Sequence, residues 1–83
     1  MAIYKNITAS GLIKTGFGRL KGMYVNSTTG GTIKFWDQTS AAVPAINNTI
    51  TPAIGYHNLG DVDFNTGLYA TIANTLDVTL HIE

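Results

Sequence analysis

The acidic side chains most suggestive of a binding site lie in the segment Asp61-Val62-Asp63-Phe64-Asn65-Thr66-Gly67. Oxygen ligands at its first, third and fifth positions match the start of a calcium-binding loop. However, its glycine comes one residue late, and position twelve is Ile72, where such a loop requires a bidentate carboxylate. We therefore interpret the segment as a β-turn with solvated Asp and Asn side chains rather than as a metal site.

Other residue types with catalytic or ligating chemistry are scattered along the chain. His57 and His81 fall on separate expected strands, and no third ligand accompanies them, so they predict no metal site. Ser10, Ser27 and Ser40 lie in turn-like surroundings, without a G-x-S-x-G elbow or an assignable His/Asp partner. The sequence therefore predicts no enzyme activity and no cofactor.

The large aromatic side chains are the better candidates for binding. By strand alternation, Trp36 faces the side opposite Ile33 and Phe35. It either folds over the rim of the core or anchors a partner, because Trp combines a large apolar area with a polar N–H. The same two alternatives apply to the tyrosines, and aromatic rings on a sheet can also stack on sugars. The tyrosines are Tyr4, Tyr24, Tyr56 and Tyr69.

The sequence consists of short runs of alternating apolar and polar residues, separated by Gly and Asn. This pattern predicts an all-β fold. We expect seven or eight short strands and no helix longer than about two turns, with Ser40–Val43 as the candidate for a single helical turn. Strands with one apolar face must pack face to face, so the predicted fold is a small antiparallel β-sandwich, jelly-roll-like, or a small barrel. The expected strands are residues 2–8, 11–15, 19–25, 32–36, 45–51, 54–59, 68–72 and 76–82.

The clearest pattern lies at the end of the chain. Alternation in residues 68–72 and 76–82 predicts a hairpin in which Ile72 opposes Leu76. The three-residue loop would then place Asn74 in the left-handed conformation.

Residues 1–9 are an N-terminal edge strand or a docking arm, followed by one domain over residues 10–83. Ile3 and Ile7 share one side of this segment, and few turn residues interrupt it. It either forms the first strand of its own sheet or pairs with a neighbouring molecule. The candidate partner contacts are therefore Ile3, Tyr4, Ile7, Trp36 and Tyr56.

Length and charge limit the classes of function. The chain has 83 residues, no cysteine, 12% charged residues and a net charge of zero. A domain this small is only marginally stable alone and gains from association. Low positive charge argues against nucleic acid as a partner, and no apolar run approaches the roughly 20 residues that span a bilayer. Because the start lacks the apolar core of a signal peptide, we expect synthesis in the cytoplasm.

Two stretches carry a family resemblance. They are SGLIKTGFGRLKGMYVNSTTGGTIKFWDQTSAA and TGLYATIANTLDVTLHIE, about residues 10–42 and 66–82. Together they resemble a class of short virion proteins of tailed bacteriophages. These often read S-G-x-I-K-T-G-x-G-x-L, then W-D or Y-D with T/N-S-A, and finally a G-L-Y-A…L-x-V-x-L hairpin. The motifs consist of turn glycines and strand alternation, and they imply no chemistry.

The resemblance implies a compact β-sandwich on the capsid surface of a virion, where some members act as decoration or cement proteins. Its implied partners are the major capsid protein and copies of itself, with a homotrimer as one arrangement. The alternative is a receptor- or carbohydrate-binding module of a tail fibre or similar appendage. Residues 43–65 lie outside the resemblance.

Overall fold

The computed structural model describes residues 3–83, which form a single antiparallel sheet of five strands. The strands are β1 (Ile3–Ile7), β2 (Gly11–Thr15), β3 (Gly18–Trp36), β4 (Gly55–Phe64) and β5 (Gly67–Ile82). No helix occurs in this described range, so the all-β prediction is confirmed there. Accordingly, none of these residues belongs to a helix that could cross a membrane.

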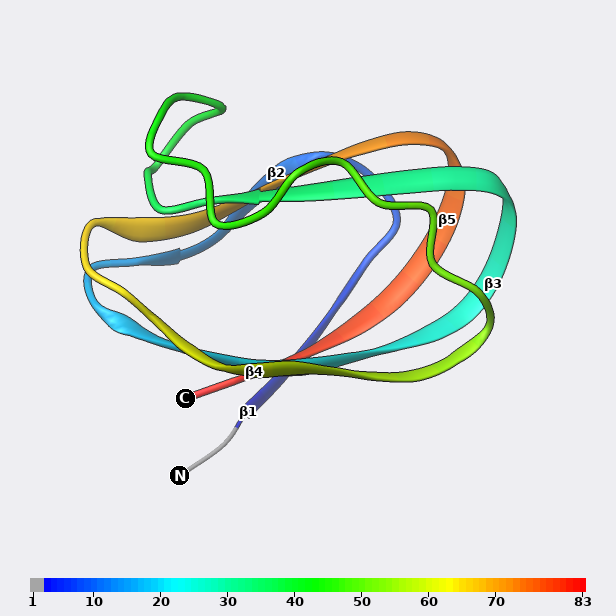
Figure 1. Cartoon of the computed structure of the whole chain (residues 1–83), viewed down its shortest axis with the longest axis horizontal. Coiled ribbons are helices and arrows are strands. Elements are labelled where there is room, and N and C mark those ends of the chain that lie inside the picture. Colours follow the sequence, from blue (N-terminus) through cyan, green and yellow to red (C-terminus); the bar gives the residue numbers. More distant parts are fainter. Residues whose placement is uncertain (1–2) are drawn as a thin grey trace.

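Two long strands organise the sheet. β3 and β5 pair antiparallel along nearly their whole lengths, from Leu20 opposite Ile82 to Trp36 opposite Tyr69. The strand order is β1-β5-β3-β4, and β2 pairs with the other half of β5. The first half of the sheet thus contains β1, the end of β5, the start of β3 and β4. The second half contains β2, the start of β5 and the end of β3 (Figure 1).

Both long strands bend at the same level, which folds the sheet over on itself. Gly30 in β3 has a φ of 62°, and Asn74 in β5 also has a φ of 62°. The register shifts between Thr29 and Gly30, as expected for a β-bulge. The Asn74 side-chain amide donates a 2.9 Å hydrogen bond to the Gly30 carbonyl oxygen, which ties the two bends together.

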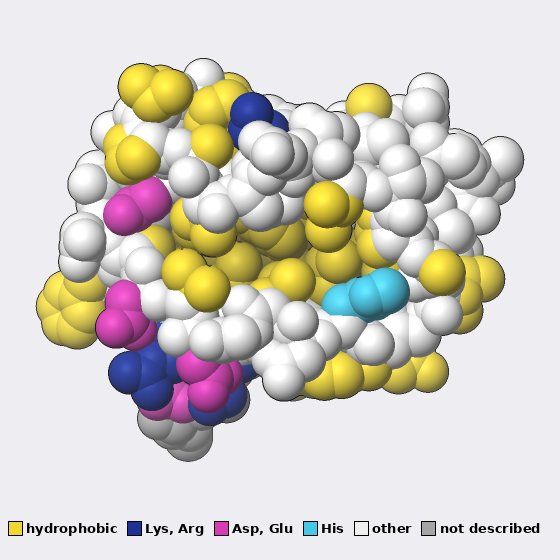
Figure 2. All heavy atoms as spheres, viewed as in Figure 1, with side chains coloured by type: hydrophobic (Ala, Val, Ile, Leu, Met, Phe, Trp, Pro, Cys, Tyr) yellow, Lys and Arg dark blue, Asp and Glu magenta, His cyan; other side chains and the backbone are white. Residues whose placement is uncertain are grey.

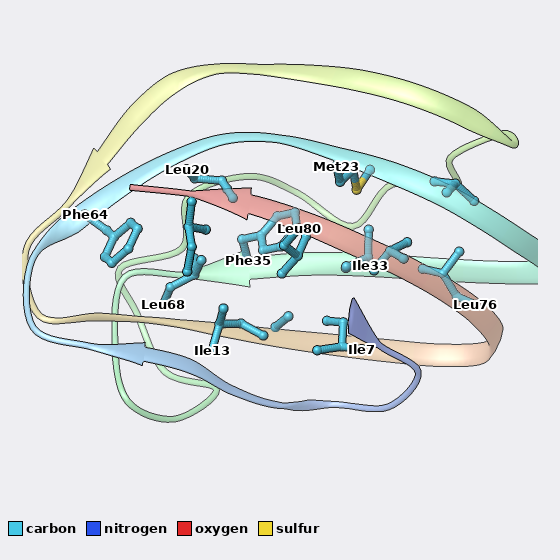
Figure 3. Close-up of a cluster of buried hydrophobic side chains, with 14 residues drawn as sticks. Ile7, Ile13, Leu20, Met23, Ile33, Phe35, Phe64, Leu68, Leu76 and Leu80 are labelled. Atoms are coloured by element: carbon cyan, nitrogen blue, oxygen red, sulfur yellow. The ribbon is translucent and has the colours of Figure 1, made fainter. Parts of the chain in front are cut away.

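The hydrophobic core lies between the two halves of the folded sheet (Figure 3). Alternate side chains point inward, as Ile33 and Phe35 do in the second half of β3. In the first half of β3, a register shift between Leu20 and Gly22 interrupts the alternation, so that Leu20 and Met23 both point inward. No polar or charged residue is buried within residues 3–83. The core consists of Ile7, Ile13, Leu20, Met23, Val25, Ile33, Phe35, Phe64, Leu68, Ala70, Leu76, Val78, Leu80 and Ile82.

The prediction of a C-terminal hairpin is wrong. Residues 67–82 form one strand, in which Ile72 pairs with Ile33 and Leu76 pairs with Thr28 of β3. Asn74 adopts the predicted left-handed conformation, but there it bends the strand instead of reversing it. The two apolar sets still face one core, because the bend brings the two halves of β5 around it.

Other predicted boundaries also change. Residues 19–25 and 32–36 belong to the single strand β3, which explains part of the excess in the expected number of strands. β4 continues through Gly60 to Phe64. Residues 45–51 contribute only two isolated bridges, Ile33 with Ile50 and Trp36 with Ala45, and the expected helical turn at 40–43 consists of bends.

Candidate functional site

The two halves of the folded sheet expose two outer surfaces with different chemistry. Because Leu20 and Met23 in the first half and Ile33 and Phe35 in the second point into the same core, the two outer surfaces lie on opposite sides of the molecule. We call them the tryptophan face (Leu12, Lys34, Trp36, Tyr69, Thr71) and the tyrosine face (Tyr4, Asn6, Tyr24, Asn26, Tyr56, Asp77, Thr79, His81).

The tryptophan face is a row of apolar side chains with a positive charge beside it. Tyr69 pairs with Leu12 on one side and with Trp36 on the other, so the three side chains are adjacent across β2, β5 and β3. The Lys34 ammonium lies 4.3 Å from the centre of the Trp36 ring, a cation–π contact. The Trp36 indole N–H donates a 3.3 Å hydrogen bond to the Thr71 hydroxyl. Trp36 is therefore held in one orientation while remaining half-buried.

The tyrosine face carries aromatic rings on all four of its strands, β1, β5, β3 and β4. Tyr4 of β1 pairs with His81 of β5, and His81 pairs with Gly22 of β3. Tyr56 of β4 covers Gly22, because a Cβ there would collide with the Tyr56 hydroxyl. The Tyr56 and His81 rings have centres 5.6 Å apart and are tilted by 36°. With Tyr24 directly opposite Tyr56, the face presents a strip of exposed aromatic rings.

A polar cluster borders the aromatic strip. The Asn6 side-chain amide donates to the Asp77 carboxylate at 2.7 Å and to the Val78 carbonyl oxygen at 3.0 Å. The Asn26 amide donates to the same carboxylate at 3.2 Å and to the Thr79 hydroxyl at 3.1 Å. These hydrogen bonds fix the orientation of two exposed amides beside the rings.

An ion-pair cluster lies where β3, β4 and the end of the chain meet. The Arg19 guanidinium bonds to the Asp63 carboxylate at 2.9 Å, and this hydrogen bond, with the charge of Asp63, raises the pKa of Arg19. The Lys21 ammonium lies 3.7 Å from Asp61 and 3.4 Å from Glu83. Pairs this exposed contribute little stability. Asp61 and Asp63 are thus paired with cations of the chain. The β-turn predicted for residues 61–67 is wrong for its first four residues, because residues 61–64 continue strand β4 and only Asn65 and Thr66 form the turn.

An apolar cleft opens between the two halves, where β4 and residues 45–50 do not meet. Its volume is about 230 Å³. In Figure 2, apolar side chains line a hollow near the middle of the surface in view. The amide oxygen of Asn47, its one polar lining residue, accepts a 2.9 Å hydrogen bond from the Phe35 N–H. The cleft therefore offers apolar contact rather than polar chemistry. It is lined by Leu20, Phe35, Ile46, Asn47, Ile50, Leu59 and Val62.

The five candidate contacts from the sequence separate into four environments. Tyr4 and Tyr56 lie together on the tyrosine face, and Trp36 lies on the tryptophan face. Ile7 is in the core, whereas Ile3 is half-exposed on β1 at the edge of the sheet. No single surface therefore combines all five residues.

The residues considered for catalysis or metal binding do not converge. The His57 ring lies 2.7 Å from the Ala53 carbonyl oxygen, and His81 packs on Tyr56. Ser10 holds the backbone of Ile72 through its hydroxyl. Within residues 3–83, no three His, Asp or Glu side chains come close enough to hold a metal ion together.

Asp37 has a structural role that the sequence reasoning missed. Its carboxylate accepts hydrogen bonds from the backbone N–H groups of Asn65 and Thr66, both at 2.9 Å, and of Gly67 at 3.4 Å. It thus holds the turn between β4 and β5 from 28 to 30 residues away. The W-D pair was visible in the sequence, but no local signal identifies the distant turn as its partner.

Comparison of the chain with protein-family models, with curated proteins and with solved structures finds no match. The function must therefore be inferred from the surfaces themselves and from the motifs in the sequence.

Proposed function

We propose that this protein is a virion structural protein that binds the outside of a bacteriophage capsid and stabilises it. The observation that carries the proposal is the row formed by Leu12, Tyr69 and Trp36 on the tryptophan face. Two of these three residue types, Trp and Tyr, are the ones that most often dominate the energy of protein interfaces. The resemblance of residues 10–42 and 66–82 to short tailed-phage virion proteins supports a capsid as the surface that is bound.

The charge on the tryptophan face indicates which kind of partner surface would fit it. Lys34 is its only charged residue in the set defined above, and its ammonium is held over the Trp36 ring. A capsid protein surface with an apolar centre and an acidic rim would complement this arrangement. Oriented side chains also lose little conformational entropy on docking, so the row is prepared for binding.

A repeated lattice suits a domain of this size. The capsid offers many identical sites, and a marginally stable domain gains stability from any partner that binds only its folded state. We place the folded sheet in the class of small β-sandwiches, of the jelly-roll-like kind expected from the sequence. β1 and β4 stand at the two ends of the strand order, so each has an outer edge with backbone groups that a neighbouring molecule can pair with. We therefore include contacts between copies in the proposal, with a trimer around a capsid axis as one arrangement.

The test uses capsids purified without this protein, to which the full chain is added. We expect wild-type protein to sediment with the capsids and to raise their melting temperature. Trp36→Ala should weaken binding by about thirtyfold, the effect of losing a central aromatic anchor. Phe17→Ala is the matched control, because Phe17 is 80% exposed but lies in the turn between β2 and β3. Equal binding by both variants, or no binding by the wild type, would contradict the proposal.

The second candidate is a receptor- or carbohydrate-binding module of a tail fibre or similar appendage. The exposed rings of Tyr4, Tyr24 and Tyr56 favour it, because such rings can stack on sugars. Quantitative mass spectrometry of purified particles separates the two candidates. A copy number matching the capsid lattice supports decoration, whereas a few copies that purify with tails support the appendage.

A further inference from the structure

We propose that the tyrosine face binds neutral oligosaccharides of pyranose sugars. The sugar rings would stack on Tyr4 and Tyr56, and their hydroxyls would hydrogen-bond to the amides of Asn6 and Asn26. This inference goes beyond capsid binding. It deepens the carbohydrate-binding candidate above by naming the ligand class and the contacting residues, and it holds wherever in a particle the protein sits.

The first support is the spacing of the rings. Tyr4 on β1, His81 on β5 and Tyr56 over Gly22 of β3 follow one another across the sheet. Neighbouring strands lie about 4.8 Å apart, so the strip spans roughly 10 Å, close to the length of two linked sugar rings. Tyr4 is 78% exposed and Tyr56 is 52% exposed, which leaves ring surface accessible to a ligand.

The second support is the fixed geometry of the strip. Tyr56 packs on the open surface above Gly22, where any side chain would displace it, and its ring contacts that of His81. A ring that is held in place loses little freedom when a flat ligand stacks on it. The Tyr56 ring is therefore already in position for stacking before a ligand binds, whereas the more exposed Tyr4 supplies the second ring surface.

The third support is the kind of polar group beside the strip. Asn6 and Asn26 are exposed amides oriented by Asp77 and Thr79, at distances between 2.7 and 3.4 Å. Amides and hydroxyls can donate to and accept from sugar hydroxyls, and a carboxylate can accept from them. Such groups around an aromatic surface fix the orientation of a ligand that the rings attract.

The composition of the face favours a sugar over other partners. The eight residues that define it include no Lys or Arg, whereas binding of nucleic acid depends on neutralising phosphates with these cations. They also include no aliphatic side chain, although the centres of protein interfaces are usually apolar. Aromatic rings combined with amides and hydroxyls match the alternating apolar faces and hydroxyl edges of a neutral sugar. The one carboxylate of the face, Asp77, already accepts hydrogen bonds from Asn6 and Asn26.

The experiment titrates the full ¹⁵N-labelled chain with tetrasaccharides of glucose, mannose, galactose and N-acetylglucosamine, monitored by NMR. At least one should shift the side-chain amide signals of Asn6 and Asn26. Tyr4→Ala and Tyr56→Ala should each weaken that binding by about tenfold, through loss of a stacking ring. Tyr56→Phe keeps the ring and should bind within about twofold of the wild type. Phe17→Ala, again the exposed aromatic control, should bind normally.

Three results would overturn the inference. The first is that none of the four tetrasaccharides shifts these signals at about 10 mM, near the limit of weak specific binding. The second is that binding occurs but Tyr4→Ala and Tyr56→Ala leave it unchanged. The third is that the same tyrosine substitutions abolish capsid binding while no sugar binds, which would make the face a protein contact. Capsid binding by Trp36→Ala is measured separately, so failure of one proposal does not decide the other.

Discussion

At the scale of single residues, the structure assigns different tasks to side chains of similar type. Tyr69 lies between Leu12 and Trp36, whereas Tyr56 covers a glycine and contacts a histidine. The two environments differ because the residues directly opposite each tyrosine on the neighbouring strands differ. A residue's type alone therefore indicated a binding surface without indicating which one.

Asp37 is partly exposed, but its hydrogen bonds should make it important for stability. Asp37→Ala removes the carboxylate that accepts from three backbone N–H groups in the turn between β4 and β5. We expect a loss of about 1–3 kcal/mol in the free energy of unfolding, measured by urea denaturation. Asp63→Ala is the control, because its ion pair with Arg19 is exposed to solvent and should contribute little to the free energy of unfolding. Equal losses in the two variants would show that Asp37 does not hold the turn.

At the scale of strands, the five residues of β1 include one isoleucine in the core and one exposed to solvent. Ile7 is 9% exposed and packs in the core, whereas Ile3 is 51% exposed at the edge of the sheet. Ile7→Ala should lower the free energy of unfolding by about 2–4 kcal/mol, and Ile3→Ala by less than about 1 kcal/mol. Denaturant titration of both variants measures the difference. If both changes prove small, β1 is not part of the stable fold, and its role as a docking arm becomes the better account.

The same scale shows how much of the fold the sequence could predict. Alternation identified inward residues in the second half of β3 and in β5, including Ile33, Phe35 and Leu76. It did not assign those of the first half of β3, where a register shift follows Leu20. It could not distinguish a hairpin from a bent strand, because both place the apolar sets on the same core. Asn74 is left-handed in either case. What decides between them is pairing with β3, a contact with residues about 40 to 50 positions away along the chain that no local pattern contains.

The candidate site was predictable to a similar extent. The outward direction of Trp36 followed from its alternation with Ile33 and Phe35, both of which are buried. The meeting of Tyr4 with His81 depends on β1 pairing with the end of β5, and the position of Tyr56 depends on β4. These are long-range pairings, so the sequence offered single aromatic candidates but could not assemble them into two faces.

At the scale of the whole molecule, folding one sheet over a single core gives the chain two opposite outer surfaces. The tryptophan face belongs to the half with β2, and the tyrosine face belongs to the half with β1 and β4. The fold allows the face proposed to dock on a capsid and the face proposed to bind sugars to act without competing for the same area.

This arrangement predicts that capsid and sugar bind at the same time. Capsids decorated with the wild-type chain should be retained on beads carrying the tetrasaccharide that binds the free protein. Undecorated capsids should pass through, and capsids decorated with Tyr56→Ala should be retained poorly. Many copies on one lattice should also strengthen retention well beyond the affinity of a single domain, because each further contact is made at high local concentration. Release of the protein from capsids by the soluble sugar would show instead that the two ligands compete, and would contradict the assignment of separate faces.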